Sequence, residues 1–363
     1  MKSQKLSNTI LVNVVLGVIV LLWLVPVIGI FASSFRDRFD IQTTPWWNVL
    51  PHRDWVATKT INPRELGLDT TAPMTVEGVT ATFEEMRAGV EEGNTRLIWI
   101  GTRPIGKIEV QEIQWVTSAN LNLDNYRQVL QGKTVEIKRA DGTVERVPGN
   151  DFYGSLLNSL TVTIPSTIIP ILIAAFAAYG FAWMNFPGRR FWFILVVALL
   201  VVPLQIALVP VLRDFAGLDL NGTFLGVWLA HTGFGLPLAT YLLFNYIRGL
   251  PRETLEAAFI DGASHFTIFT RLILPLSIPA LASFAIFQFL WVWNDYLVAL
   301  IILGPDPTGR VVTMTLASIV GTRGQDWHLL TAGAFVSMLI PLIVFFGLQR
   351  YFVRGLLAGS VKG

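Results

Sequence analysis

The chain has 363 residues, of which 53% are hydrophobic and only 14% are charged. This balance is too apolar for an ordinary soluble domain of that length and indicates an integral membrane protein. The 27 basic and 25 acidic residues leave a net charge of +2, which provides no case for nucleic acid as a partner, and the absence of cysteine excludes disulfides, thiolate catalysis and Cys-ligated metal sites.

Six apolar windows are long enough to cross a bilayer, which takes about 20 residues of helix. They cover residues 11–32, 158–184, 191–212, 224–247, 278–303 and 329–349. The first follows Lys2 and Lys5, so a cleaved signal peptide is an alternative, but its apolar run exceeds the roughly 7–15 residues of a signal peptide and predicts an uncleaved anchor. Prolines inside the windows are expected to kink the helices at Pro203, Pro210, Pro237, Pro279 and Pro341.

Basic residues in short loops indicate the orientation of the helices, because translocating them across a membrane is unfavourable. With the N-terminus inside, only Arg213, Arg310 and Arg323 fall in short loops on the outer side. Both termini are therefore predicted to be cytoplasmic. The basic residues on that inner side are Lys2, Lys5, Arg189, Arg190, Arg248, Arg252, Arg271, Arg350, Arg354 and Lys362.

A polar segment, residues 33–153, separates the first two windows and carries 17 of the 25 acidic residues. Alternating patterns at 95–100 and 133–138 predict strands, and Asp141-Gly142 predicts a hairpin turn. We therefore expect an external, β-rich inserted domain. Its tryptophans could form a partner surface, although packing in a core or at a membrane interface is the commoner role; they are Trp46, Trp47, Trp55, Trp99 and Trp115.

Two apparent chemical motifs fail on inspection. Residues 101–107 approach a phosphate-binding P-loop, but Ile108 stands where a hydroxyl must ligate magnesium, Pro104 interrupts the loop, and the segment is predicted to be external. The four histidines, His52, His231, His265 and His328, form no ligand pair. No catalytic residue and no metal site is predicted, so the chain is not expected to be an enzyme.

The predicted cytoplasmic loop between the fourth and fifth windows, residues 249–279, has the pattern of two short helices. Pro251 suits a first helical turn, Glu253 and Glu256 favour the positive end of a helix, and Gly262 can end one. The spacing of apolar residues predicts one stripe along the pair, formed by Leu255, Phe259, Gly262, Phe266, Phe269 and Ile273. An interfacial helix resting on lipid headgroups is the alternative interpretation.

The residue string favours a docking element over that alternative. EAAFIDGA at 256–263, followed by ILPLSIP at 273–279, resembles the EAA loop of permease subunits from binding-protein-dependent ABC importers. In that family a short coupling helix seats in a cleft of an ATPase subunit. The resemblance implies that no cofactor binds to this chain, that ATP and Mg bind to the partner ATPase, and that the docking residues are Glu256, Ala257, Ala258, Asp261, Gly262 and Pro275.

Three further segments resemble carbohydrate permeases of the maltose MalG type: residues 185–190, 293–295 and 355–363. The fold implied is an all-α integral membrane protein with six transmembrane helices and a MetI-like core. The tail and first helix would occupy 1–32, the insertion 33–153 and the permease core 154–363. The insertion is longer than is usual in this type and resembles the alpha-glucoside branch. The partners implied are a second homologous permease subunit, two ATPase subunits, a soluble or lipid-anchored solute-binding protein and membrane lipid. The location implied for the chain is the cytoplasmic (inner) membrane.

Four polar residues within the windows are candidates for the translocation path or a subunit contact. A carboxylate inside a spanning helix costs a few kcal/mol and usually faces a cavity or partner. Asp295 lies sixteen residues after Pro279, which places it beyond the midplane of a continuous helix. Alternatively, that helix ends early and Asp295 lies near the outer headgroups. Asn294 adds polarity beside it, whereas His231 and Gln205 are more often interhelical hydrogen-bond partners.

These features predict a subunit of an ATP-driven importer for a sugar or oligosaccharide. A permease for another solute such as a polyamine is the alternative within the class, and the segment 293–296 and the C-terminal VKG favour sugar. A secondary transporter is the alternative from another class. It should show inverted repeats and several charged residues within the membrane windows, but only Asp295 is such a residue. A membrane-anchored sensor should carry a cytoplasmic output domain, for which the tail after the sixth window is too short.

Overall fold

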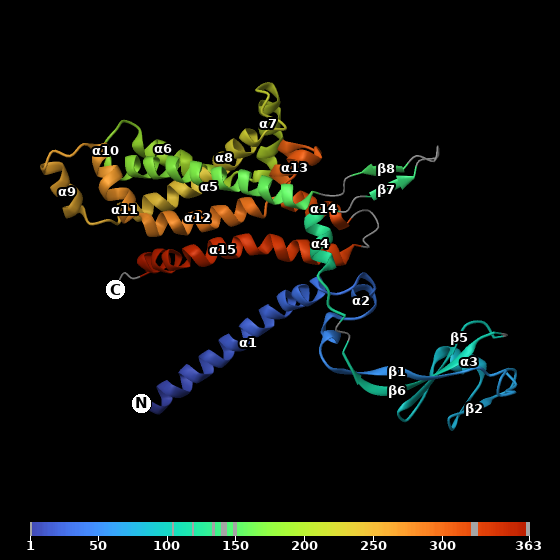
Figure 1. Cartoon of the computed structure of the whole chain (residues 1–363). Coiled ribbons are helices and arrows are strands. Elements are labelled where there is room, and N and C mark those ends of the chain that lie inside the picture. The colour runs from blue at the N-terminus through green and yellow to red at the C-terminus, as the bar shows by residue number, and fades with distance from the viewer. Residues whose placement is uncertain are drawn as a thin grey trace. The chain divides into compact units, whose positions relative to one another are not determined.

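The computed structural model describes residues 2–103, 105–117, 120–132, 135–138, 144–147, 151–320 and 326–360. The chain divides into two compact units, Met1–Asn122 and Leu123–Gly363. Figure 1 shows the elements of both units.

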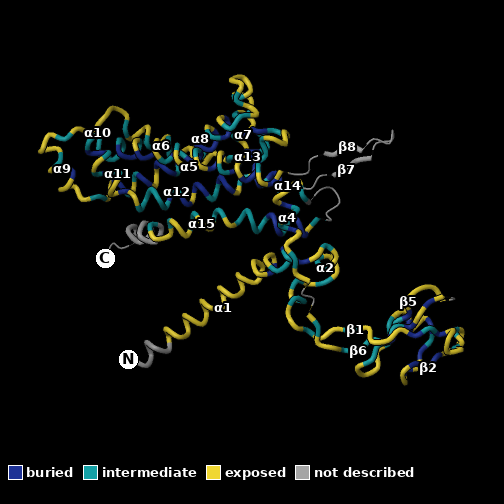
Figure 2. The backbone as a smooth tube through the Cα atoms, in the orientation of Figure 1, coloured by how far each residue is buried: buried dark blue, intermediate teal, exposed yellow. Residues whose placement is uncertain are grey.

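The first unit begins with a long apolar helix, α1 (Lys2–Ser34), followed by α2 (Arg38–Thr43) and the 3-10 turn η1 (Trp46–Val49). The side chains of α1 from Asn8 on are almost all exposed (Figure 2), which suits a helix whose solvent is lipid. Beyond α1, Arg36 is buried and donates to the carbonyls of Asp40 and Thr44, which ties α2 back to the end of α1. Burial lowers the pKa of this guanidinium group.

The rest of the first unit is built around one antiparallel sheet in the order β1-β6-β5-β4. Its strands are β1 (His52–Ile61), β4 (Val90–Glu92), β5 (Thr95–Ile100) and β6 (Lys107–Val116). A second, two-stranded sheet pairs β2 (Met74–Val76) with β3 (Val79–Ala81), and α3 (Phe83–Ala88) follows it. The predicted strand 95–100 is confirmed as β5. The predicted strand 133–138 corresponds to β7 (Val135–Lys138), which belongs to the second unit and pairs with β8 (Val144–Val147). The predicted turn at Asp141-Gly142 lies outside the described residues.

Inward-facing residues of the sheet bury the core of this unit. Leu97 of β5 and Ile108 of β6 are completely buried. Trp99 packs edge-on against Phe83 of α3, with ring centroids 5.0 Å apart. Of the five tryptophans considered above, Trp99 therefore packs in the core. By contrast, Trp115 is 72% exposed and Trp47 is 55% exposed, so packing within this chain does not explain all of them.

Helix α3 begins with a capping box that makes its stability depend on pH. The carboxylate of Glu85 accepts from the backbone N–H of Thr82 at 2.7 Å and from its hydroxyl at 2.9 Å, and these bonds hold the pKa of Glu85 below its usual value. Because the folded-state pKa is lowered, the stabilisation is complete above the usual glutamate pKa and is lost as pH falls through the lowered value.

We expect amide exchange in α3, corrected for the intrinsic effect of pH, to lose protection on acidification through that range. Glu85→Gln keeps an acceptor that does not ionise, so its protection should vary less with pH. The same pH dependence in both proteins would contradict the assignment.

The second unit is a helical body in which α5 (Phe152–Trp183), α8 (Phe224–Arg248), α12 (Ile278–Trp293) and α15 (Trp327–Ser360) pack side by side (Figure 1). The shorter helices α4 (Asp124–Gln131) and α14 (Val312–Val320) pack against its members. Small side chains let α5 approach α8 closely, since Ala174, Ala175 and Ala178 are all buried in the shared core. The outward faces of α5 are apolar and exposed (Figure 2), as expected where lipid surrounds the helices.

By length and composition, the described residues contain four helices able to cross a membrane, or six if each of two bent pairs counts as one span. The third expected window is one of these pairs. Its first part is α6 (Arg189–Ala198), extended by the 3-10 turn η2 (Leu199–Val201), and its second part is α7 (Leu204–Gly217), bent from the first by 105°. Pro203 stands at the bend, where its missing N–H interrupts the helical hydrogen bonds. The window 191–212 is therefore a broken span, and the kink expected at Pro203 is confirmed.

The fifth window also departs from a single helix. α12 ends at Trp293, and a separate α13 (Leu297–Leu303) follows a break of three residues. Before α12, the chain bends by 70° at Ser277, after α10 (His265–Ile268), the π-helical turn η3 (Phe269–Ile273) and α11 (Leu274–Leu276). The bend lies next to Pro279, one of the predicted kink positions.

Candidate functional site

The predicted docking residues gather on a loop built from α9 (Arg252–Ile260) and α10, at one end of the helical body (Figure 1). Leu255 is completely buried and fixes α9 to the unit. Glu256 and Ala257 are exposed, and Ala258 is half-buried. Ile260, at the end of α9, is 86% exposed. α9 therefore packs on the helical body through Leu255 and the half-buried Ala258, and its outer face presents carboxylate and apolar groups.

Gly262 ends α9 by a left-handed turn. Its φ is +77°, a backbone conformation that side chains with a Cβ rarely adopt. Its N–H donates to Phe259, and the N–H of Ala263 donates to Ala258, so the last carbonyls of the helix are satisfied in a Schellman arrangement. Nothing lies within 4 Å of the position where a Cβ would stand, so backbone conformation and not crowding requires glycine here.

The second half of the loop is tied to α5. His265 Nδ1 lies 2.8 Å from the hydroxyl of Tyr179, and the ring of Phe269 packs 4.1 Å from that of Phe176. Ser264 caps α10 by accepting from the N–H of Thr267. Pro275 is exposed on α11, just before the bend at Ser277. The docking loop, residues 249–279, is thus anchored to α5 through His265 and Phe269.

The apolar stripe expected along this loop forms only in part. Leu255, Phe269 and Ile273 are buried as expected. Phe266 is 66% exposed and Phe259 is 37% exposed, whereas Ile268, which the pattern missed, is buried. The stripe assumed one continuous helical phase, but the left-handed turn at Gly262 and the π-helical turn η3 both change the phase. The exposed surface of the docking loop consequently includes aromatic rings, Phe259 and Phe266, as well as the carboxylates of Glu256 and Asp261.

Two of the four intramembrane candidates meet in the structure. His231 of α8 is 1% exposed, and its Nε2 lies 3.6 Å from Oδ2 of Asp295. Asp295 also accepts from the backbone N–H groups of Val298 at 3.3 Å and Ala299 at 2.9 Å, so its carboxylate caps α13. Among the described residues, neither ring nitrogen of His231 has a hydrogen-bond partner. The pair joins α8 to the break after α12.

The other two candidates lie elsewhere. Asn294 is exposed and donates to the carbonyl of Leu290 one turn back, and Gln205 is exposed on α7. The expectation that Asp295 sits within a continuous helix is wrong, because α12 ends two residues before it. The alternative that the helix ends early describes the backbone correctly.

A buried amide in α12 was missed by the sequence interpretation. Gln288 is completely buried, and its Nε2 donates to the carbonyls of Ser166 at 3.2 Å and His231 at 3.4 Å. A Cβ on Gly235 would lie 2.7 Å from this amide, so α8 has glycine where the side chain of α12 approaches its backbone. The signal was available, since Gln288 is an amide near the middle of an apolar window and such residues commonly bridge membrane helices.

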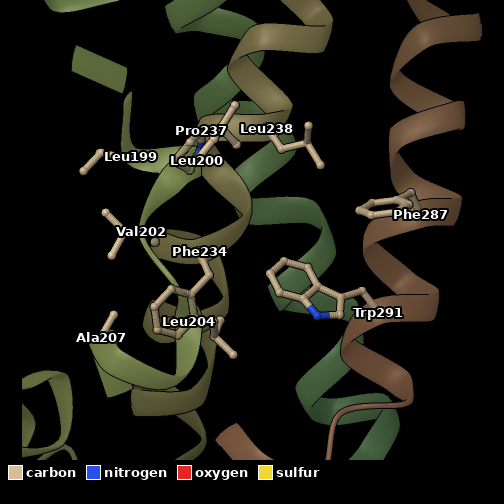
Figure 3. A pocket seen from close by; sticks show the side chains of 11 residues that line it. Leu199, Leu200, Val202, Leu204, Ala207, Phe234, Pro237, Leu238, Phe287 and Trp291 are labelled. Carbon is tan, nitrogen blue, oxygen red and sulfur yellow. The ribbon is translucent and has the colours of Figure 1, made fainter. Parts of the chain in front are cut away.

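An apolar pocket of about 460 Å³ lies beside this polar contact (Figure 3). Phe287 and Trp291 of α12 face Phe234 of α8 and the break between η2 and α7 across it. Trp291 also packs edge-on against His231, with ring centroids 6.0 Å apart. The lining of the apolar pocket therefore offers aromatic surface for stacking and few hydrogen-bonding groups.

Comparison with known proteins decides the family. Residues 163–357, which include the docking loop, His231 and Asp295, match the family described as binding-protein-dependent transport system inner membrane component. The chain belongs to this family. The resemblance noted in the docking loop is thereby confirmed, and the match places both candidate sites inside the family's shared region.

Relatives of this inner membrane component extend over its whole length. It is 46% identical over 370 residues to the osmoprotective compounds uptake permease protein GgtD of Synechocystis sp., covering 99% of this chain and 98% of that protein. It is 43% identical over 393 residues to the alpha-glucoside transport system permease protein AglG of Rhizobium meliloti, covering 99% of both. The similarity to the alpha-glucoside branch therefore includes the inserted segment.

The fold of this inner membrane component is also known from a crystal structure. A chain of a bacterial ABC transporter involved in the import of the acidic polysaccharide alginate superimposes with a TM-score of 0.58 and 17% identity, covering 94% of this chain and 95% of that one. At this identity the match establishes a shared fold. The protein is therefore a membrane-embedded ABC permease subunit by family and by architecture.

Proposed function

We propose that this permease subunit forms half of the translocation path of an ATP-driven importer for a sugar or oligosaccharide. The observation that carries the proposal is full-length similarity to a permease named for alpha-glucosides. The melibiose/raffinose/stachyose import permease MelC of Bacillus subtilis, 28% identical over 251 residues, adds support from a second sugar importer. A second homologous permease would supply the other half of the path, and a soluble or lipid-anchored binding protein would deliver the solute.

ATP hydrolysis belongs to separate ATPase subunits in this proposal. The exposed part of the docking loop supports that role, because Ile260 and Phe266 offer apolar anchors beside the carboxylates of Glu256 and Asp261. Buried apolar anchors with charged neighbours are typical of stable protein contacts. The docking end would face the cytoplasm, with both termini on that side of the inner membrane.

A second candidate solute follows from the relative in Synechocystis, whose name refers to osmoprotective compounds. The two solute classes are distinguished by uptake in a strain that lacks this chain, supplied with radiolabelled alpha-glucosides, osmoprotective solutes and a polyamine. We expect the deletion to reduce alpha-glucoside uptake and the restored gene to recover it.

Polyamine uptake is the internal control and should not change. Loss of osmoprotectant uptake alone would favour the second candidate. Unchanged uptake of every sugar tested would contradict the sugar proposal.

A further inference from the structure

Four arginines from three helices converge on one pocket at the docking end of the helical body. This basic pocket has a volume of about 310 Å³ and lies where α5 ends, α6 begins and α8 passes into α9. Its lining residues are Phe181, Ala182, Trp183, Arg189, Arg190, Phe193, Phe244, Arg248 and Arg252. The preference for cytoplasmic basic residues explains their number at this end but not their convergence from separate elements on one hollow.

The positive charge of the basic pocket is not neutralised within the chain. Among the described residues, no carboxylate lies within ion-pair distance of any of its four arginines. Arg189 donates to the carbonyl of Met184 and to Asn185, which fixes its position without adding a charge. Arg189 and Arg252 are also the first residues of α6 and α9, where the helix dipole is positive. An anion placed here would meet guanidinium groups and two helix N-termini together.

The inner wall of the basic pocket is aromatic and continues onto the lipid-facing surface. The ring of Phe193 packs 5.5 Å from Phe181 and 4.2 Å from Phe244. Along the adjoining face of α6, Phe191 is 63% exposed, Trp192 is 52% exposed and Ile194 is 56% exposed. The combination of a basic rim with an apolar, exposed continuation matches a molecule that carries an anionic head and hydrocarbon tails.

We infer that the basic pocket binds the phosphate headgroup of an anionic phospholipid, with its acyl chains against the exposed face of α6. Basic hollows at the ends of membrane helices are suited to such headgroups, and guanidinium forks match phosphate oxygens. A carboxylate of a docked protein would satisfy the charge equally well but would leave the apolar continuation on α6 without a role. The site is independent of the proposed solute.

The test is lipid binding by the full-length chain purified in detergent, titrated with phosphatidylglycerol or with phosphatidylcholine of the same acyl chains and followed by native mass spectrometry. We expect phosphatidylglycerol to bind more tightly. Arg190→Gln combined with Arg248→Gln should weaken its binding about 30-fold, which corresponds to about 2 kcal/mol for two guanidinium groups. Neither side chain makes a hydrogen bond within the described structure. The guanidinium carbon of Arg248 lies 5.9 Å from the ring centroid of Phe244, so the glutamine variant also removes this cation–π contact, whereas a lysine at the same position keeps the charge.

Arg213→Gln combined with Arg350→Gln is the matched control. Both arginines are exposed and lie outside the pocket, and their substitution removes the same amount of charge. It should retain the lipid preference, as should Arg190→Lys combined with Arg248→Lys. No preference in the unaltered chain, or an undiminished one in the glutamine variant, overturns the inference. Displacement of the lipid by an equal concentration of inorganic phosphate overturns it in favour of a free-anion site. If the glutamine variant still binds the lipid but no longer binds the ATPase, the pocket is part of a protein interface, and the inference is overturned as well.

Discussion

Replacing Gly262 by aspartate is expected to abolish most ATP-driven uptake while leaving the chain folded in the membrane. The residue has φ +77°, and a side chain with a Cβ in this region costs about 1–2 kcal/mol, enough to shift the turn toward another conformation. The turn sets the direction in which α10 leaves α9, so the loop would no longer present Glu256 and Phe266 together. We expect uptake to fall by about tenfold or more, since about 1.4 kcal/mol corresponds to a factor of ten.

The measurement is uptake in membrane vesicles, together with recovery of the ATPase with the purified chain. Gly222→Asp is the matched control, because Gly222 has φ +76° and also has nothing within 4 Å of its Cβ position, but lies outside the docking loop. Gly262→Asn should be milder than Gly262→Asp, since asparagine tolerates the left-handed region better than most residues. Normal uptake and ATPase recovery with Gly262→Asp would show that the loop does not dock.

The second large effect is expected from Asp295→Ala. Its carboxylate accepts from the N–H groups of Val298 and Ala299 at the start of α13, so alanine leaves these two groups without their side-chain acceptor. Alanine also removes the carboxylate that lies 3.6 Å from buried His231. Loss of a helix cap alone lowers the free energy of unfolding by about 1–2 kcal/mol. We expect a clear fall in the thermal unfolding midpoint of the detergent-purified chain, measured by intrinsic fluorescence.

The neighbouring substitution Asn294→Ala provides the comparison for that experiment. Asn294 is exposed and bonds only to a carbonyl of its own helix, so its removal should change the midpoint little. Asp295→Asn keeps one acceptor oxygen and should fall between the two. If Asn294→Ala and Asp295→Ala have equal effects, the capping role assigned to Asp295 is wrong.

The docking loop shows how far local sequence reasoning reaches. Pro251 at the start of α9 and Gly262 after its end mark boundaries that the structure confirms, because both residues act through their own backbone. Which aromatic rings face the core was predicted less well. Phe266 is exposed and Ile268 is buried, the reverse of what was expected, since the left-handed turn at Gly262 restarts the helical phase before α10.

The intramembrane residues show the opposite limit. A hydropathy window averages over about 20 residues, so it cannot register a three-residue break such as the one between Trp293 and Leu297. The pairing of His231 with Asp295 joins residues 64 positions apart and follows from helix packing, which no local pattern specifies. Strand β5 was predicted because the alternation of apolar and polar residues is a local property of the sequence. The order of the strands in the sheet was not predicted, because it depends on pairing between distant segments.

The anchoring of the docking loop to α5 has a mechanical consequence. Tyr179 and Phe176 hold α10 and η3 near one end of a helix of 32 residues, which spans about 48 Å. Ser155, near the other end, shares a hydrogen bond with Thr315 of α14. The loop contacts and the contact with Thr315 are therefore joined by one helix whose hydrogen-bond ladder is interrupted at Pro165 and Pro170, so a displacement of the loop would reach α14 through a helix that can bend at these prolines.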